Sequence, residues 1–142
     1  MSRNTARPLS PHLTIWKWGP HMLVSILHRA TGTALAIGGG VLFTGWLAAA
    51  ASGPEGYASF YYYAAAAAEG DTLGYWSNVL AKVVLIGLTW SVFQHMFSGL
   101  RHFVLDTGAG YELKTNKMGS IATIVGSLVV TALIWAWLLT RG

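Results

Sequence analysis

Residues 118–139 read MGSIATIVGSLVVTALIWAWLL, a mainly apolar stretch near the end of the chain. No ionisable side chain occurs between Gly119 and Thr140. An α-helix of roughly 20 mainly apolar residues is long enough to cross the hydrocarbon core of a bilayer. The stretch therefore predicts a transmembrane helix, and with it a membrane protein.

Two further segments of similar length precede this one. Residues 22–51 are strictly apolar after Gly32, and residues 76–104 are apolar apart from a few polar side chains. We expect three transmembrane helices at about residues 22–51, 76–104 and 118–139, within one all-α membrane domain that covers residues 1–142. Residues 1–20 would precede the first helix. The second segment includes the polar side chains Lys82, Gln94, His95, Arg101 and His102.

Composition agrees with a membrane protein. Of the 142 residues, 54% are hydrophobic and 10% are charged, whereas soluble domains carry about 25% charged residues. This excludes a disordered chain and disfavours a soluble enzyme. The chain has no cysteine, which excludes an iron–sulfur cluster, a zinc–thiolate site and a cysteine nucleophile within it. The net charge of +4 is spread along an apolar chain, so it indicates membrane orientation and not nucleic-acid binding.

Lysine and arginine residues distinguish the two sides of the membrane. Arg3, Arg7 and Lys17 precede the first predicted helix, and Lys114 and Lys117 lie between the second and third. The loop between the first and second helices has three acidic residues and no lysine or arginine. The positive-inside rule predicts a cytoplasmic N-terminus. With no signal-peptide core in residues 1–20 and no long transit sequence, we expect a multi-pass protein of a bacterial inner membrane.

The first loop contains an unusual segment. Residues 56–70 read GYASFYYYAAAAAEG. Because alanine favours helix, we expect a short interfacial helix whose tyrosines lie at the level of the lipid headgroups. A loosely ordered external loop is the alternative.

Polar and ionisable side chains gather toward the cytoplasmic ends of the first two helices. Ser25, His28 and Arg29 are spaced i, i+3 and i+4, which places them on one helical face. His95 lies seven residues before His102, and is therefore about 10 Å deeper in the membrane. Ionisable groups in spanning helices usually mark a functional site. The pattern predicts one deep histidine below a shallower tier of histidines and arginines.

This layering suits haem, a flat apolar ring with carboxylates at one edge. Imidazole is an axial ligand of haem iron, and arginine pairs well with carboxylates. His95 is therefore the candidate iron ligand, while Arg29, His28 or His102 would reach the propionates. The small residues that continue the His28 face would let a porphyrin or another helix come close. They are Gly32, Ala36 and Gly39 or Gly40.

Simpler explanations compete with each assignment. The small residues fit helix packing alone, and His95 would then hydrogen-bond a neighbouring helix. Arg101 and Lys82 lie near helix ends, where long basic side chains snorkel toward water. His12 and His21 have no periodic context, and we assign them no role.

Three motifs carry a resemblance to a known family. Residues 7–13 read RPLSPHL, residues 25–32 read SILHRATG, and residues 95–106 read HMFSGLRHFVLD. In this order they resemble the cytochrome b556 membrane-anchor subunits of succinate dehydrogenase, respiratory complex II, a tricarboxylic acid cycle enzyme. The resemblance extends over essentially the whole chain.

The resemblance implies an architecture and a set of partners. A large and a small anchor subunit each supply three helices, so this chain would form half of a bundle that binds one haem b. A flavoprotein subunit with FAD and an iron–sulfur subunit would dock on the cytoplasmic side. Electrons would pass from succinate through these cofactors to ubiquinone.

The resemblance also implies roles for individual residues. His95 matches the family's axial haem ligand, and the second ligand would come from the partner anchor. Ser25 and Arg29 match its quinone-site serine and arginine, and His28 matches a histidine beside the haem propionates. We expect Arg29 and His102 at the haem periphery as well.

Elementary chemistry supplies reasons for some of these roles. Arg29 would polarise a quinone carbonyl and stabilise developing negative charge, and Ser25 would donate a hydrogen bond to a quinone oxygen. Protons would enter from the cytoplasmic surface, with help from His28, His102 and Asp106.

Two other functions remain compatible with the sequence. One is the anchor of a quinol:fumarate reductase, which runs the reaction in reverse. The other is a structural or transport membrane protein without a redox cofactor, in which the histidines would serve packing alone.

Overall fold

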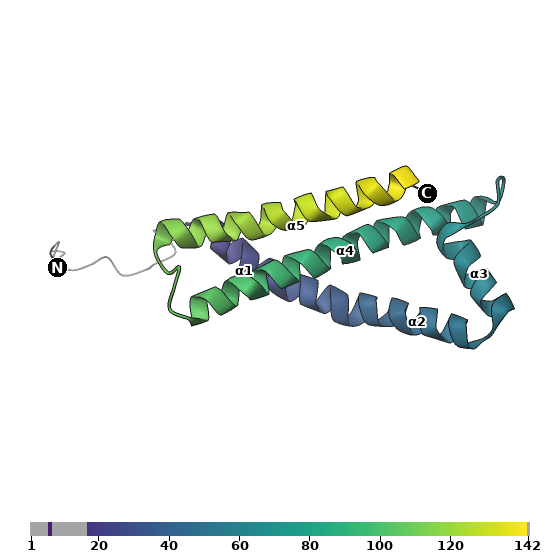
Figure 1. The fold of residues 1–142 in the computed structure, drawn as a ribbon, viewed down its shortest axis with the longest axis horizontal. Coiled ribbons are helices and arrows are strands. Elements are labelled where there is room, and N and C mark those ends of the chain that lie inside the picture. The colour runs from purple at the N-terminus through teal and green to yellow at the C-terminus, as the bar shows by residue number, and fades with distance from the viewer. Residues whose placement is uncertain (1–5, 7–16, 142) are drawn as a thin grey trace, which may run out of the picture.

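The computed structural model describes Ala6 and residues 17–141. The first long helical segment consists of α1 (Pro20–Ala34), the π-helical turn η1 (Leu35–Gly39) and α2 (Gly40–Ala51). The short helix α3 (Pro54–Ala65) and the long helices α4 (Thr72–Asp106) and α5 (Leu113–Arg141) follow (Figure 1). Pro20–Ala51, Thr72–Asp106 and Leu113–Arg141 are each long and apolar enough to cross a membrane. The all-α fold with three transmembrane helices is confirmed.

Each long helix extends beyond its predicted limits. α4 begins at Thr72 because the Asp71 side chain caps its first turn, accepting a hydrogen bond from the Gly74 N–H at 3.0 Å. α5 begins at Leu113, so the two lysines expected in the preceding loop belong to the first turns of the helix. Most of the expected N-terminal segment, including Arg3, Arg7, His12 and the RPLSPHL motif, lies outside the described residues.

The buried interior is polar and the exposed surface is apolar, the reverse of a soluble protein. Among the described residues, Val24 is the only buried large apolar side chain. Small hydroxyl side chains let transmembrane helices approach closely, which explains their position between the helices. On α5 they recur at helical spacing. The buried polar residues are Thr31, Asn78, Ser91, Gln94, Ser98, Ser120, Thr123, Ser127 and Thr131.

Hydrogen bonds link α4 to α5 at three depths. The fully buried Gln94 accepts from the Ser127 hydroxyl at 2.8 Å near the middle. Trp135 donates its indole N–H to Thr89 at 3.2 Å toward one end. Arg101 donates to the Asn116 side chain toward the other end. These contacts fix the register between the two helices.

The first helical segment follows α4 over only part of its length. α1 packs against both α4 and α5, and η1 still contacts α4. α2 then diverges from α4, and α3 closes the gap at the far end (Figure 1). An apolar crevice of about 590 Å³ lies between α2, α3 and α4. The tightly packed half of the bundle is therefore the half that contains the candidate histidines.

The tyrosine- and alanine-rich segment forms the helix α3, so the helical alternative is confirmed over Pro54–Ala65. The buried side chain of Asn78 ties this helix to α4. Its amide donates to the carbonyls of Tyr62 and Tyr63 at 2.9 and 2.8 Å. Its oxygen accepts from the Ala67 N–H at 3.1 Å. One side chain thus satisfies backbone groups that the end of α3 leaves open.

Candidate haem and quinone site

His28 on α1 and His95 on α4 meet between the two helices. Their imidazole rings stack with centroids 3.9 Å apart and planes inclined by 10°. The sequence placed His28 in a shallower tier than His95, whereas the structure places the two rings face to face. Counting residues along one helix gives depth within that helix only. How far two helices are displaced along each other depends on how they pack.

A hydrogen bond fixes the orientation of the His95 ring. Its Nδ1 lies 3.0 Å from the backbone carbonyl of His28. A carbonyl oxygen can only accept, so Nδ1 carries the proton and Nε2 keeps its lone pair. Among the described residues, no hydrogen bond to Nε2 is found. Histidines that ligate metals usually donate their other ring N–H to a carbonyl or carboxylate in this way.

Two glycines lie beside the histidine pair, and the missing side chain at Gly32 leaves room for the His95 ring. Gly32 follows His28 by four residues, and Gly99 follows His95 by four residues. A Cβ atom on Gly32 would lie 2.9 Å from Cε1 of His95, too close for the ring to keep its position. A Cβ atom on Gly99 would lie 3.9 Å from Cε1 of His28. Each glycine therefore faces the histidine of the opposite helix.

Ser25 and Arg29 lie apart from the histidine pair. Both are exposed, and the Arg29 Nε donates to the Ser25 carbonyl at 3.4 Å. His28 points toward α4, where its neighbours Val24 and Thr31 are buried. The three residues thus divide between an outward-facing pair and an inward-facing histidine. The outward pair is open to a ligand or a partner chain.

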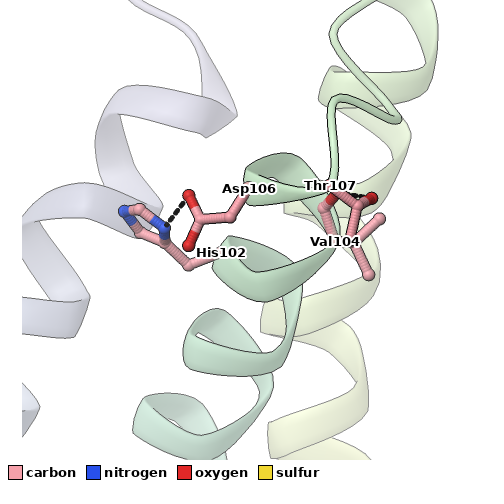
Figure 2. Close-up of polar contacts among 4 residues, drawn as sticks. All are labelled: His102, Val104, Asp106 and Thr107. Atoms are coloured by element: carbon pink, nitrogen blue, oxygen red, sulfur yellow. Dashed lines mark hydrogen bonds and ion pairs between the residues drawn. The ribbon is translucent and has the colours of Figure 1, made fainter.

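The remaining predicted residues lie at the end of α4. The side chains of His102 and Asp106 are paired, with Nδ1 and Oδ1 3.3 Å apart (Figure 2). Their side chains are 71% and 59% exposed, so they are open to water or to a docked subunit. Arg101 instead turns toward α5 and the Asn116 side chain. The sequence had left snorkelling as the simplest explanation for Arg101, and the structure gives it a packing role.

The residues present fit a haem ligand site of the single-histidine type. In the described part of the chain there is no group of three or more His, Cys, Asp or Glu side chains that would hold a metal ion. Haem iron needs only one or two axial imidazoles, since the porphyrin supplies the other ligands. His95 meets this need because its Nδ1 is held and its Nε2 is free. Gly32 leaves room for that ring.

Ser98 contacts the His28 ring, although its place in the sequence indicates no such role. Ser98 is 4% exposed, and its hydroxyl lies 2.6 Å from Nδ1 of His28. The signal in the sequence was the spacing of Ser91, Gln94 and Ser98 by three and four residues, which marks one buried face. Gln94 and Ser98, which belong to this face, flank His95 in the sequence.

Comparison with known proteins identifies the family. Residues 3–134 match the family described as succinate dehydrogenase/fumarate reductase transmembrane subunit. The succinate dehydrogenase cytochrome b556 subunit of Paracoccus denitrificans is 35% identical over 127 residues, covering 89% of this chain and 88% of that protein. The corresponding subunit of Rickettsia conorii is 31% identical over 129 residues, covering 91% and 90%.

A mitochondrial protein is similar as well. The succinate dehydrogenase cytochrome b560 subunit of Mus musculus is 35% identical over 125 residues, covering 87% of this chain and 68% of that protein. The resemblance drawn from the three motifs is confirmed. The chain belongs to the family of succinate dehydrogenase/fumarate reductase transmembrane subunits.

Proposed function

We propose that this chain is the cytochrome b anchor subunit of a succinate dehydrogenase, complex II. In this proposal it holds haem b and forms part of the site where ubiquinone is reduced. Family membership and the names of the similar proteins support the anchor role. The observation that carries the haem assignment is the His95 ring, with its Nδ1 bonded to a backbone carbonyl and its Nε2 free.

His95 is the proposed axial ligand, and a second axial ligand would come from the small anchor subunit. Bound haem would supply a one-electron redox centre within the bundle. This chain's own part is to hold the His95 ring in one orientation and to exclude water from it. The basic residues near the same end of the bundle, Arg29 and His102, would contact the haem periphery together with His28.

Ser25 and Arg29 are the proposed quinone residues. Both are exposed and adjacent on α1. A guanidinium there would donate charge-assisted hydrogen bonds to a quinone oxygen, each worth roughly 1.5–3 kcal/mol. The Ser25 hydroxyl would donate a further hydrogen bond. His102 and Asp106, which are paired at the surface, would pass protons toward this site.

The electrons would reach this site from partner subunits. The cysteine-free chain supplies no iron–sulfur ligand, so an iron–sulfur subunit and an FAD-containing flavoprotein would dock at the cytoplasmic end. The chain would then lie in a bacterial inner membrane with its N-terminus in the cytoplasm. The distribution of Lys114, Lys117 and Lys17 supports this orientation.

A quinol:fumarate reductase anchor is the second candidate, because the matching family covers both enzymes. The similar proteins are named succinate dehydrogenase subunits, which favours the succinate-oxidising direction. Family membership favours either of these over a transport protein without a redox cofactor.

An Arg29→Leu variant of the assembled complex tests the quinone assignment. We expect succinate-to-ubiquinone activity to fall by one to several orders of magnitude, at about 1.4 kcal/mol per tenfold. Ser25→Ala should cause a smaller loss. Succinate oxidation with an artificial acceptor that draws electrons upstream of the quinone should persist in both variants. Lys82→Leu, which removes a cation from the opposite end of α4, should change neither activity.

Two outcomes would count against the quinone assignment. Normal quinone reduction by an assembled Arg29→Leu complex would contradict it. An equal loss in Lys82→Leu would show that the effect comes from removing any membrane cation. Co-purification of all subunits, checked for each variant, separates these outcomes from failed assembly.

A further inference from the structure

Ser98 is the only buried hydroxyl side chain in the described residues whose oxygen contacts a histidine ring. The other buried serines, Ser91, Ser120 and Ser127, bond only to backbone carbonyls or to Gln94. Ser98 bonds to the carbonyls of Gln94 and His95, and its oxygen also lies 2.6 Å from Nδ1 of His28. The Ser98 hydroxyl therefore links the backbone of α4 to the His28 ring on α1.

The Ser98 hydroxyl lies between its own helix and the His28 ring. The Gln94 carbonyl is 2.8 Å from the hydroxyl oxygen and the His95 carbonyl is 3.1 Å away. A hydroxyl both donates and accepts, and either nitrogen of a neutral imidazole can carry the proton, so Ser98 hydrogen-bonds Nδ1 of His28 in whichever tautomer that ring adopts. This hydrogen bond fixes the orientation of the His28 ring.

His28 in turn holds His95 in two ways. Its backbone carbonyl accepts from Nδ1 of His95 at 3.0 Å, and its ring covers one face of the His95 ring at 3.9 Å. The last torsion of a histidine side chain is broad and nearly two-fold when nothing constrains it. A ring that is bonded at Nδ1 and covered on one face cannot rotate without moving its neighbour.

We propose that Ser98 is a positioning residue that fixes the rotation of the His95 ring through His28. Ser98 locks the His28 ring by a hydrogen bond, and the stacked His28 ring then sets the plane of His95. The inference rests on the proposed function, in which His95 ligates haem iron. Ser98 does not reach the iron in this arrangement, since its contacts are with His28 and with its own helix.

The experiment compares three variants of the complete complex purified from membranes. Ser98→Ala removes the hydroxyl. Ser98→Cys keeps the shape of the side chain with a larger atom, and replaces the hydroxyl by a thiol that is a weak hydrogen-bond donor and acceptor. Ser91→Ala is the matched control, because Ser91 is a 5% exposed serine on α4 that bonds only to the Gly87 carbonyl at 2.8 Å. The readouts are the electron paramagnetic resonance spectrum of the oxidised haem and its midpoint potential.

The g values of a low-spin ferric haem depend on the orientation of its axial imidazole planes. We expect both Ser98 variants to keep their haem but to show shifted and broadened low-spin signals with a changed midpoint potential. Ser91→Ala should match the wild type in both readouts. If Ser98→Ala does not assemble, Ser98→Cys supplies the same comparison.

Wild-type signals and potential in a Ser98 variant would overturn the inference, as would equal shifts in Ser91→Ala. These failures differ from failure of the proposed function. If the wild-type complex itself showed no b-type haem, the haem assignment would be wrong. If it showed haem that Ser98 substitution left unchanged, only the role of Ser98 would be wrong.

Discussion

Two pairs of residues with the same spacing, His28 with Gly32 and His95 with Gly99, lie at the contact between α1 and α4. The helices are antiparallel neighbours, so each glycine lies opposite the other helix's histidine. The imidazoles then stack at 3.9 Å. At the scale of single residues, the site therefore depends on the missing side chain at Gly32 as well as on the two imidazole rings.

Gly32→Ala tests the importance of this close approach. A Cβ atom at Gly32 would lie 2.9 Å from Cε1 and 3.3 Å from Nδ1 of His95. We expect the His95 ring to be displaced and the haem absorption band to be weakened or shifted in the purified complex. Gly45→Ala is the control, because no atom lies within 4 Å of its Cβ position. An unchanged spectrum in Gly32→Ala would show that the ring has room to spare.

Sequence spacing predicted part of this site. It singled out His95 from depth, and Gly32 as a small residue that permits close approach. It could not predict that the approaching group is the His95 ring, because this depends on how far α1 is displaced along α4. The same unknown displacement explains why His28 was placed too shallow. Ser98 belongs to the motif at residues 95–106. Its role could not be predicted, because the sequence does not distinguish a serine that bonds only to its own helix from one that also bonds to a histidine of another helix.

At the scale of secondary-structure elements, the junction of α3 and α4 is tied together by side chains of Tyr62, Asp71 and Asn78. The Tyr62 hydroxyl donates to Asp71 at 2.7 Å and accepts from the Ala68 N–H at 3.2 Å. The Gly74 N–H, and after it the Tyr62 hydroxyl, lower the pKa of Asp71 below its usual 3.8. The hydrogen bond to Asp71 raises the pKa of Tyr62 above its usual 10.0.

These pKa shifts predict the pH range in which the junction is stabilised. A lowered carboxyl pKa stabilises the fold above 3.8, and the contribution is lost as the pH falls through the folded-state value. A raised tyrosine pKa stabilises the fold below 10.0, and that contribution is lost as the pH rises through the folded-state value. We expect Asp71→Ala to lower the Tm of the purified complex near neutral pH, and the difference from wild type to shrink below pH 3.8.

Glu69→Ala is the matched control for this measurement, because Glu69 is an exposed acid two residues before Asp71. Circular dichroism should show little change in Tm for this variant at any pH. A difference between Asp71→Ala and wild type that stayed constant from neutral pH into the acid range would contradict the proposed role of the carboxylate.

The elements themselves were largely predictable, while their connections were not. The three long helices were predicted from the length and apolar composition of their segments. The short helix α3 was predicted from its alanine content. The Asn78 contacts could not be predicted, since an asparagine near the start of a spanning helix has no distinctive spacing. The π-helical turn at Leu35–Gly39 was also missed, because the glycines there were interpreted as a packing face.

At the scale of the whole molecule, the arrangement of polar and apolar side chains suits a subunit of a larger membrane assembly. Hydroxyl and amide side chains fill the contacts among α1, α4 and α5, and large apolar residues cover the outside. The basic residues Lys114 and Lys117 lie in the first turns of α5, at the end where α4 finishes. The proposal that soluble subunits dock at this end requires it to face the cytoplasm.

Labelling of a cysteine at Ser59 tests this orientation. Ser59 is exposed on α3, at the opposite end of the bundle from the lysines of α5. Because the chain has no other cysteine, Ser59→Cys gives a single site. We expect an impermeant thiol reagent to label it in intact spheroplasts. A cysteine at Thr115 should react only after the membrane is broken, and the reverse pattern would overturn the proposed topology.

The central claim is that His95 ligates haem iron, and the reduced-minus-oxidised absorption spectrum of the assembled complex tests it most directly. His95→Ala is compared with His102→Ala, in which a 71% exposed histidine at the end of the same helix is removed. We expect His95→Ala to abolish or alter the b-type haem band, because one axial ligand is gone, and His102→Ala to change it much less. A normal low-spin, two-histidine spectrum in His95→Ala would contradict the account.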